Sequence, residues 1–370
     1  MQSKKMKIMF IVGALSRGGA EKVVSILSSE CAEKGHDVSL VLLNNVEKTY
    51  TISDKIKILQ IDADDKKLRE IIRMKTLRGF IRQVKPDVIV PFLPSVSLYT
   101  LIAGAGIRKN VIMSERADPN INIRSPKLSK KEKIFHILMR QMELFSLADH
   151  MVFQTPDAQA FYSKKLQKKS TVIPNPLDAS ALPERFEGKR DKRIVAAGRF
   201  SDEKNFPMLI RAFARFREDF PDYILELCGE GALKGEFDAL CSKLNIQENI
   251  LMPGFVSDLA DRMVNAAMYV STSNHEGISN SMLEALGMGV PTIVTDCPIG
   301  GAKMFVKTDE NGILIKMNDE DALVEAMIKI ASDEGYAESI SKNAVKIREE
   351  LNAKKITEKW IEIFEKFISR

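Results

Sequence analysis

The sequence predicts an α/β protein built from two Rossmann-like domains. With 370 residues the chain is long enough for two domains that each bury a full core. Short apolar runs alternate with segments of helical periodicity in both halves, and most of these runs end in glycine or small polar residues. A charge-rich linker over residues 178–192 separates the halves. We therefore predict an N-terminal domain over residues 1–175, a C-terminal domain over 192–352 and a final helix within 353–370.

The first half opens as a Rossmann-like unit. Lys7–Val12 is an apolar run typical of a buried parallel strand, and Gly13 ends it. A helix is predicted after Gly18 and Gly19, because apolar residues recur at helical spacing from Val23 to Cys31. The glycines lack the Gly-x-Gly-x-x-Gly spacing of dinucleotide sites. Gly18 and Gly19 therefore indicate either a close approach of the backbone to a ligand or a plain tight turn.

Further strands are predicted from apolar runs of strand length. They cover residues 38–43, 86–91, 111–113 and 151–155 in the first half, and 193–197, 223–228, 250–256, 268–273 and 291–295 in the second. Helical periodicity covers residues 66–84, 320–351 and 356–368. The uncharged run over residues 88–107 has membrane-spanning length, but its prolines and serines favour a strand, a loop and a helix instead.

Composition and charge narrow the functional classes. The four cysteines are far apart without paired metal-ligand spacing, which indicates a reducing cytosol and neither a disulfide framework nor a zinc site. No secretion signal is apparent, so we expect a cytoplasmic protein. The net charge of +5 combines +13 in residues 1–175 with −8 in residues 176–370. A basic first half favours an anionic membrane surface or a phosphorylated acceptor. No nucleic-acid-binding module is recognisable.

Two carboxylates eight positions apart mark the most informative segment. We expect Glu276 on a loop and Glu284 in the first turns of a helix that begins with Ser279 or Asn280 as its N-cap. A helix start binds phosphate, and a carboxylate can accept hydrogen bonds from sugar hydroxyls. This layout suits a nucleotide sugar. The alternative is an ordinary loop in which Glu276 lies on a turn and Glu284 faces solvent.

Several motifs resemble those of the retaining glycosyltransferase family 4. They are Glu276-Gly277, Glu284-Ala285 and Gly289-Val290-Pro291, the Gly198-Arg199 and Lys204-Asn205 pairs, and Gly18-Gly19-Ala20-Glu21. Val172–Leu177 is similar to the family's interdomain hinge. The resemblance extends from Gly18 to Trp360 and implies the GT-B fold, in which two Rossmann-like domains face a common cleft and a C-terminal helix crosses back to the first domain.

The resemblance implies a role for particular residues. Arg199 and Lys204 are expected to bind the donor diphosphate and to stabilise the charge on the leaving group, while Glu276 meets the hydroxyls of the transferred sugar and Glu284 those of the ribose. The alternative for Arg199 and Lys204 is a surface ion pair with Asp202 and Glu203. The expected donor site comprises Gly18, Gly19, Gly254, Val256, Gly277, Ile278, Ser279, Asn280, Ser281 and Glu284.

Arg116 follows the predicted strand over residues 111–113, where many family members carry a histidine. An arginine there cannot act as a base, but it can hold a phosphate or a sugar oxygen. We count it with Arg199, Lys204 and Glu276 as a candidate catalytic residue; the alternative is a surface ion pair with Glu115 or Asp118.

The segment from Pro126 to Leu147 is basic and amphipathic. It includes Lys130, Lys131 and Lys133 among apolar residues. This pattern indicates either a helix that lies on anionic lipid or a packed helix with a solvated charged face.

The resemblance implies a retaining transfer of a sugar from a nucleoside diphosphate donor, a UDP-hexose or UDP-N-acetylhexosamine, to a glycan acceptor carried on a polyprenyl diphosphate or another lipid. It implies no cofactor and no metal, because Arg199, Lys204 and the helix N-terminus supply the positive charge. It places the enzyme in the cytoplasm, in peripheral contact with the inner membrane face. Two alternatives are a nucleotide-sugar 2-epimerase of the same fold and a non-catalytic protein that binds nucleotide sugars.

Overall fold

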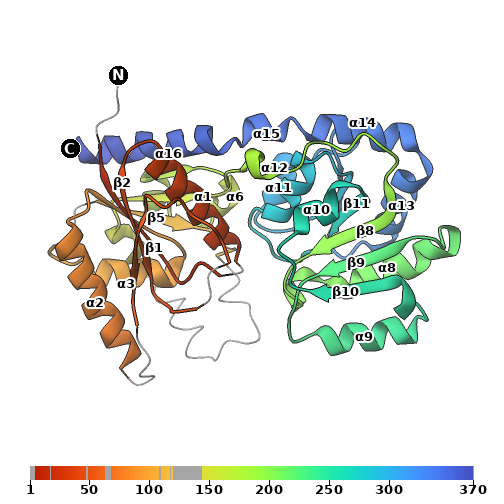
Figure 1. Cartoon of the computed structure of the whole chain (residues 1–370), viewed down its shortest axis with the longest axis horizontal. Helices are drawn as coiled ribbons and strands as arrows, with labels where there is room; N and C mark the ends of the chain where they lie inside the picture. The colour runs from red at the N-terminus through yellow and green to blue at the C-terminus, as the bar shows by residue number, and fades with distance from the viewer. Residues whose placement is uncertain are drawn as a thin grey trace. The chain divides into compact units, whose positions relative to one another are not determined.

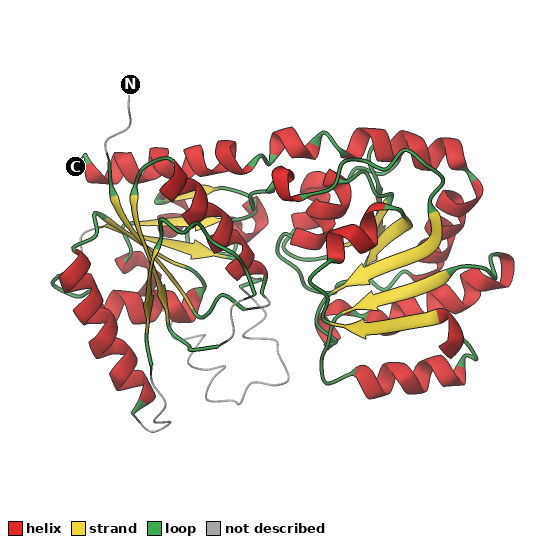
Figure 2. Cartoon of the chain, viewed as in Figure 1, coloured by secondary structure: helices red, strands yellow, loops and turns green. Residues whose placement is uncertain are grey.

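The chain forms two compact α/β units, each built around a parallel sheet. The computed structural model describes residues 5–16, 18–46, 49–62, 68–107, 110–116, 118–119 and 144–369. The first unit comprises Met1–Pro176 together with Ala353–Arg370, and the second comprises Leu177–Asn352. Figure 1 labels the elements along the chain, and Figure 2 shows the strands of each unit between helices.

The first unit has seven parallel strands among its described residues, in the order β3-β2-β1-β4-β5-β6-β7. The strands are β1 (Lys7–Val12), β2 (Asp37–Leu42), β3 (Lys57–Gln60), β4 (Val88–Pro91), β5 (Asn110–Glu115), β6 (His150–Phe153) and β7 (Ser170–Val172). The central strands are buried along almost their whole length, as their continuous apolar runs predict for a sheet covered on both faces. Lys7 of β1 pairs with Asp37 of β2, and the register continues to Val12 and Leu42.

Helices cover this sheet. They are α1 (Gly19–Glu33), α2 (Arg69–Val84), α3 (Pro94–Ala103), α6 (Pro156–Ala160), α7 (Lys164–Lys168), the 3-10 helix η1 (Leu144–Leu147) and α16 (Ala353–Ile368). The run over residues 88–107 forms strand β4, a turn and helix α3, as its prolines predicted. No helix in the described ranges is long and apolar enough to cross a membrane.

The last helix of the chain, α16, packs on the first unit. Ile356, Trp360 and Phe364 recur every four residues and are buried, so they form one apolar stripe. The Trp360 ring stacks on Phe92 with 6.1 Å between ring centroids. Figure 1 shows α16 beside α1, and Lys34 at the end of α1 forms an ion pair with Glu358. The helix therefore belongs to the first unit.

The second unit has six parallel strands among its described residues, in the order β10-β9-β8-β11-β12-β13. They are β8 (Asp191–Ala197), β9 (Ile224–Cys228), β10 (Ile250–Gly254), β11 (Ala266–Ser271), β12 (Thr292–Asp296) and β13 (Ile313–Lys316). The helices are α8 (Phe206–Asp219), α9 (Lys234–Lys243), α10 (Leu259–Val264), α11 (Asn280–Gly287), α12 (Gly301–Phe305), α13 (Glu320–Ser332), α14 (Glu334–Ala344) and α15 (Ile347–Glu350), with 3-10 turns η2 (Ala179–Ala181), η3 (Asp202–Lys204) and η4 (Gln247–Asn249).

The core of the second unit lies between the sheet and α8, α9 and α13. Phe200, Phe206 and Phe237 form mutual ring contacts with centroids 5.2–5.9 Å apart. Phe200 lies within the Gly198–Lys204 segment and Phe206 begins α8 just after it, so this packing fixes the position of the loop that carries Arg199 and Lys204.

Candidate functional site

The candidate site lies at the carboxyl edge of the second sheet. From β8 the chain proceeds outward through β9 and β10, and from β11 it proceeds in the opposite direction through β12 and β13. In open parallel sheets a ligand crevice forms where the strand order reverses, beyond the carboxyl ends of the two central strands. The loop after β8 carries Arg199 and Lys204, and the loop after β11 carries Glu276.

Lys204 and Glu276 form an ion pair between Nζ and Oε2. Their side chains are 18% and 26% exposed, so the pair is reachable but mostly enclosed. Burial disfavours the charged ammonium, but the Glu276 carboxylate outweighs that effect and raises the pKa of Lys204 above its ordinary value. Ser273 Oγ donates a further hydrogen bond to the same carboxylate oxygen over 3.3 Å. The alternative that pairs Lys204 with Asp202 or Glu203 on the surface is therefore wrong.

Arg199, five residues before Lys204 in the sequence, has an exposed side chain. Within the part of the chain that the structure describes, its guanidinium makes no hydrogen bond or ion pair. The surface ion pair with Asp202 or Glu203 is thus absent for Arg199 as well. An exposed guanidinium without a protein partner has all its donors available to an anionic ligand.

Because Gly198 has no side chain, the Lys204 side chain can pass close to its backbone and reach Glu276. A Cβ atom at Gly198 would lie 2.7 Å from Lys204 Cε, much closer than real Cβ contacts. Any larger residue at this position would push the lysine side chain aside. The glycine of the Gly198-Arg199 pair is therefore explained by its close approach to Lys204.

Hydrogen bonds between the two loops hold the ion pair in place. Thr272 Oγ1 donates to Lys204 O over 2.9 Å and to Asn205 O over 3.1 Å. The Asn274 backbone N–H donates to Glu203 O over 2.8 Å. Asn205 adopts the left-handed conformation, with φ 47°, that asparagine tolerates better than most residues. These contacts join the ends of β8 and β11 into one unit.

Helix α11 begins as the sequence predicted. Ser279 is the N-cap, and its Oγ accepts a hydrogen bond from the Met282 backbone N–H over 3.4 Å. Asn280 is the first helical residue. The Ser279 and Ser281 hydroxyls lie 3.1 Å apart, and Ser281 also bonds the buried Tyr269 hydroxyl over 2.8 Å.

Glu284 lies in the second turn of α11 and is only 5% exposed. The alternative in which it faces solvent is therefore wrong. Ile278 and Gly277 are also buried, and Gly277 lines a narrow cavity beside the start of α11. The cavity is lined by Ser271, Ser273, Glu276, Gly277, Ser279, Met282, Val294, Thr295, Cys297 and Ala302.

Two turns lie side by side in the second unit, and one of them carries Gly254 and Val256 of the expected donor site. Gly254 ends β10 in the left-handed conformation at φ 83°, and its carbonyl accepts from the Gly229 N–H over 2.8 Å. Glu230 Oε1 accepts from the Phe255 N–H over 3.3 Å, next to the half-buried Val256.

Gly18 and Gly19 lie at the start of α1 in the first unit. Gly18 is the N-cap with extended backbone, and Gly19 is the first helical residue. A Cβ atom at Gly18 would lie 1.9 Å from Glu21 Oε2. The close approach that the glycine allows is thus made by a carboxylate in the first turn of α1.

Arg116 is buried in the first unit, with 8% exposure, so the alternative of a surface ion pair with Glu115 or Asp118 is wrong. Its Nε donates to Ser114 Oγ over 2.7 Å, and Nη1 donates to Ile173 O and Asn175 Oδ1 over 3.1 Å each. Nη2 has no hydrogen-bond partner among the described residues. The guanidinium is mostly committed to protein acceptors, and a contact with phosphate or sugar stays a prediction.

The predicted basic amphipathic helix from Pro126 falls almost wholly outside the described residues, and Lys130, Lys131 and Lys133 lie there. Its last part, Leu144–Leu147, forms the 3-10 helix η1.

Sequence reasoning missed the residues that support the Lys204–Glu276 pair. Thr272 and Ser273 orient the two loops, and Tyr269 anchors Ser281. Small polar residues directly after a buried strand were the available signal, because such residues face the ligand crevice of a parallel sheet.

Comparison with known proteins agrees with this architecture. A model described as Glycosyltransferase Family 4 matches residues 17–181, and one described as Glycosyl transferases group 1 matches residues 181–347. A sucrose-phosphate synthase from Thermosynechococcus elongatus superposes with a TM-score of 0.85 at 18% identity, covering 99% of this chain and 100% of the other. HepE of Anabaena in complex with UDP-glucose superposes with a TM-score of 0.78 at 16% identity, covering 98% and 100%.

These likenesses and the two parallel sheets define a GT-B enzyme of the glycosyltransferase class. A relative in Campylobacter jejuni is the GalNAc-alpha-(1->4)-GalNAc-alpha-(1->3)-diNAcBac-PP-undecaprenol alpha-1,4-N-acetyl-D-galactosaminyltransferase, which is 24% identical over 369 residues and matches 97% of this chain and 98% of its own. The two family models together span residues 17–347, so this glycosyltransferase carries a Glycosyltransferase Family 4 domain followed by a Glycosyl transferases group 1 domain.

Proposed function

We propose that this protein is a retaining glycosyltransferase that moves a sugar from a UDP-linked donor to a lipid-linked glycan. The observation that carries the proposal is the Lys204–Glu276 ion pair at the carboxyl ends of β8 and β11. In this pair a cation suited to a diphosphate lies next to a carboxylate suited to sugar hydroxyls, and this combination supports the binding of a nucleotide sugar.

The donor diphosphate binds Arg199 and Lys204 in this proposal. The bond between the anomeric carbon and the β-phosphate oxygen breaks, the acceptor oxygen bonds to the same face of that carbon, and its proton passes to the leaving phosphate. The Arg199 guanidinium has no protein partner among the described residues, and Lys204 is charged at neutral pH, since its pKa is raised above the ordinary value of 10.5. These two cations make a metal ion unnecessary for charge stabilisation.

The remaining donor contacts follow the loops of the second unit. Glu276 accepts hydrogen bonds from the transferred sugar, and Glu284 accepts them from the ribose. The Gly277–Ser281 segment meets the phosphate at the start of α11, and the turn around Gly254 and Val256 meets the base. In the first unit, Gly18 and Gly19 lie at the start of α1. We propose that they contact the donor on the side that faces the acceptor.

Relatives support the acceptor class. The Campylobacter jejuni relative is named for an undecaprenol-PP-linked glycan, and the Anabaena neighbour is in complex with UDP-glucose. We therefore propose a glycan on a polyprenyl diphosphate as acceptor, and the cytoplasmic face of the membrane, reached by peripheral contact, as the place of reaction. We propose no nucleic-acid partner.

The experiment has two stages. A thermal-shift panel of UDP-, GDP-, ADP- and dTDP-sugars identifies the donor, because a ligand that binds only the folded state stabilises it. The stabilising donor is then incubated with lipid-linked glycans and the products are separated. An elongated acceptor with retained anomeric configuration supports the proposal. An epimerised donor would establish the 2-epimerase, and donor binding without any product would establish a non-catalytic binding protein.

A further inference from the structure

Three hydroxyl groups form a chain at the start of α11. Tyr269 lies on β11, between β8 and β12, and is fully buried. Its hydroxyl lies 2.8 Å from Ser281 Oγ, and Ser281 Oγ lies 3.1 Å from Ser279 Oγ. Ser279 is the N-cap of α11 and is 8% exposed. The chain therefore runs from a buried strand of the second unit to the helix start that belongs to the expected donor site.

The direction of this chain follows from the proton of Tyr269. Burial raises the pKa of the phenol, so the group keeps its proton. A buried O–H without an acceptor is costly, and Ser281 Oγ is the acceptor that the structure gives it. The Ser281 proton is then left for Ser279 Oγ. Because Ser279 Oγ also accepts the Met282 backbone N–H, both of its lone pairs are used, and its own proton is available to a further acceptor.

The Ser279 hydroxyl and the Glu276 carboxylate belong to residues that line the same narrow cavity, whose volume is about 10 Å³. A space of roughly this size accepts one water-sized group. Glu276 Oε2 is engaged by Lys204 and Ser273, whereas Oε1 has no hydrogen bond within the part of the chain that the structure describes. The cavity thus offers one hydroxyl donor, from Ser279, and one carboxylate acceptor, from Glu276.

A group that satisfies both residues must accept one hydrogen bond and donate another. A phosphate oxygen accepts but does not donate, and the Glu276 carboxylate would repel it. An alcohol hydroxyl does both, because its proton can go to Glu276 Oε1 while its lone pair accepts the Ser279 proton. A water molecule has the same capacity and is the competing occupant.

We infer that Tyr269 is a positioning residue for the transferred sugar of the donor. Through Ser281 it holds the Ser279 hydroxyl as a hydrogen-bond donor to one sugar hydroxyl, and that sugar hydroxyl donates to Glu276. Tyr269 itself does not touch the sugar. The inference rests on the proposed function for the kind of donor, and it adds that this contact recognises the sugar rather than the diphosphate.

Calorimetric affinities of UDP and of UDP-sugars for the full chain test the role of Tyr269. The probes are UDP-glucose, UDP-galactose and the corresponding UDP-N-acetylhexosamines, and the tightest of them is compared with UDP. Tyr269→Phe keeps the ring and removes the hydroxyl. We expect it to weaken the binding of the UDP-sugar roughly three- to tenfold, which corresponds to one modest hydrogen bond, and to change the affinity for UDP less than twofold.

Tyr223→Phe is the matched control. Tyr223 is buried in the same unit, but it directly precedes β9 and so lies at the opposite edge of the sheet from the site. Loss of its hydroxyl should change both affinities less than twofold. Urea unfolding of both variants reports their stability. A purely structural role of Tyr269 would weaken UDP and the UDP-sugar alike, because both ligands use the same loop.

Three results would overturn the inference. Equal losses for UDP and the UDP-sugar would assign the effect of Tyr269 to the diphosphate or to the loop as a whole. Parent-like affinities in Tyr269→Phe would leave water as the occupant of the cavity. A parent protein that binds UDP as tightly as every UDP-sugar would lead to the same conclusion.

Ser281→Ala tests whether the chain acts as a unit. If Tyr269 acts only through Ser281, the double variant should lose no more affinity for the UDP-sugar than Ser281→Ala alone. Losses that multiply would show that the two hydroxyls act independently, and the chain would be refuted. Ser281 is only half-buried, so Ser281→Ala by itself should show the same split between UDP-sugar and UDP even where Tyr269→Phe does not fold.

The proposed function can fail separately from this inference. A loss confined to the UDP-sugar in Tyr269→Phe, without transfer to any lipid-linked glycan, would refute the proposed acceptor and keep the role of Tyr269. Transfer by the parent protein with equal losses in Tyr269→Phe would do the opposite. If the thermal-shift panel selects another base, the diphosphate and the diphosphate sugar of that base replace the UDP pair, so a wrong base refutes the UDP donor alone. A parent protein that binds no nucleotide sugar would overturn both.

Discussion

The guanidinium carbon of Arg116 lies 5.4 Å from the centroid of the Trp360 ring and 5.7 Å from that of Phe92. Arg116 follows β5, whereas Trp360 lies on the last helix of the chain. The same guanidinium bonds Ile173 and Asn175, which lie in the segment that leaves the first unit. One buried cation therefore holds both the departing segment and the returning helix to the first unit.

Replacing Arg116 with lysine should destabilise the first unit by about 2–4 kcal/mol. The substitution keeps the charge, but all three ammonium donors radiate from one nitrogen, whereas Arg116 reaches Ser114 from Nε and both Ile173 and Asn175 from Nη1. Each buried acceptor left unbonded costs roughly 1–3 kcal/mol. Urea unfolding checks this, with the exposed Arg199→Lys as the control that should leave stability unchanged. Equal midpoints for the two variants would show that the Arg116 hydrogen bonds contribute little.

Lys204→Ala should reduce the turnover number about 10²–10³-fold, because a cation that faces the developing charge of the leaving group is lost. The variant should remain folded, since the lysine lies in a loop and its side chain is outside the hydrophobic core. Initial rates with the identified donor and acceptor give the readout. Lys192→Ala is the control, because Lys192 lies on β8, the strand that precedes the Lys204 loop, and its ion pair with Asp222 is exposed. Near-normal turnover of Lys204→Ala would remove Lys204 from the site.

Gly198→Ala should lower activity through the position of Lys204. The added methyl group would lie 2.7 Å from Lys204 Cε and would separate the ammonium from Glu276. Gly235→Ala is the matched control: it lies in α9 with open space around its Cβ, and alanine there should stabilise the helix by up to about 1 kcal/mol. Donor affinity and rate are measured for both. Parent-like activity in Gly198→Ala would show that the loop relaxes around the methyl group.

The Lys204–Glu276 pair also predicts a pH dependence of stability. The pKa of Lys204 in the folded protein is raised above its ordinary value of 10.5. The stabilisation from the charged lysine is therefore fully present below pH 10.5 and is lost as the pH rises through the raised pKa. The difference in unfolding free energy between the parent and Lys204→Met should be constant from about pH 6 to 9 and should fall above about pH 10.5. A decline already below pH 9 would contradict the raised pKa.

The cysteines should be unreactive in the folded protein. Burial raises the pKa of Cys31, Cys228 and Cys297 to about 12 and that of Cys241 to about 11, so almost no thiolate exists at pH 7.5. Iodoacetamide at pH 7.5 should leave all four unmodified by mass spectrometry until urea is added. Rapid modification of Cys297 in the native protein would show that the cavity beside Glu276 opens to solvent.

Much of the fold could be predicted because the signals are local. The apolar run Lys7–Val12 became β1 with the predicted bounds, and Ser279 caps α11 as expected. The apolar stripe on the last helix predicted a packed helix, and periodicity reports such burial directly.

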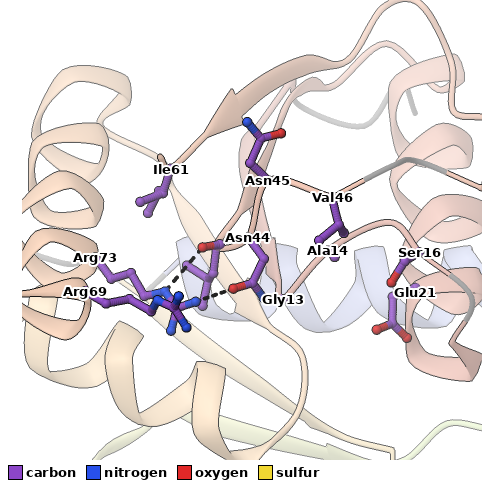
Figure 3. A pocket seen from close by; sticks show the side chains of 11 residues that line it. Gly13, Ala14, Ser16, Glu21, Asn44, Asn45, Val46, Ile61, Arg69 and Arg73 are labelled. Carbon is purple, nitrogen blue, oxygen red and sulfur yellow. Dashed lines mark hydrogen bonds between the residues drawn. The ribbon is translucent and has the colours of Figure 1, made fainter. Parts of the chain in front are cut away.

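For the candidate site, too, the sequence predicts the local features, and the tertiary structure decides the contacts between distant residues. The sequence by itself placed Arg199, Lys204, Glu276 and Glu284 in loops and at a helix start, because glycine, capping residues and strand ends are short-range features. Only the tertiary structure decided that Lys204 pairs with Glu276, that Arg116 is buried against Trp360, and that Arg69 and Arg73 share a cavity with Asn44 (Figure 3). These contacts join residues far apart in the chain, and which strand ends become neighbours depends on the order of strands in the sheet, which no local pattern encodes.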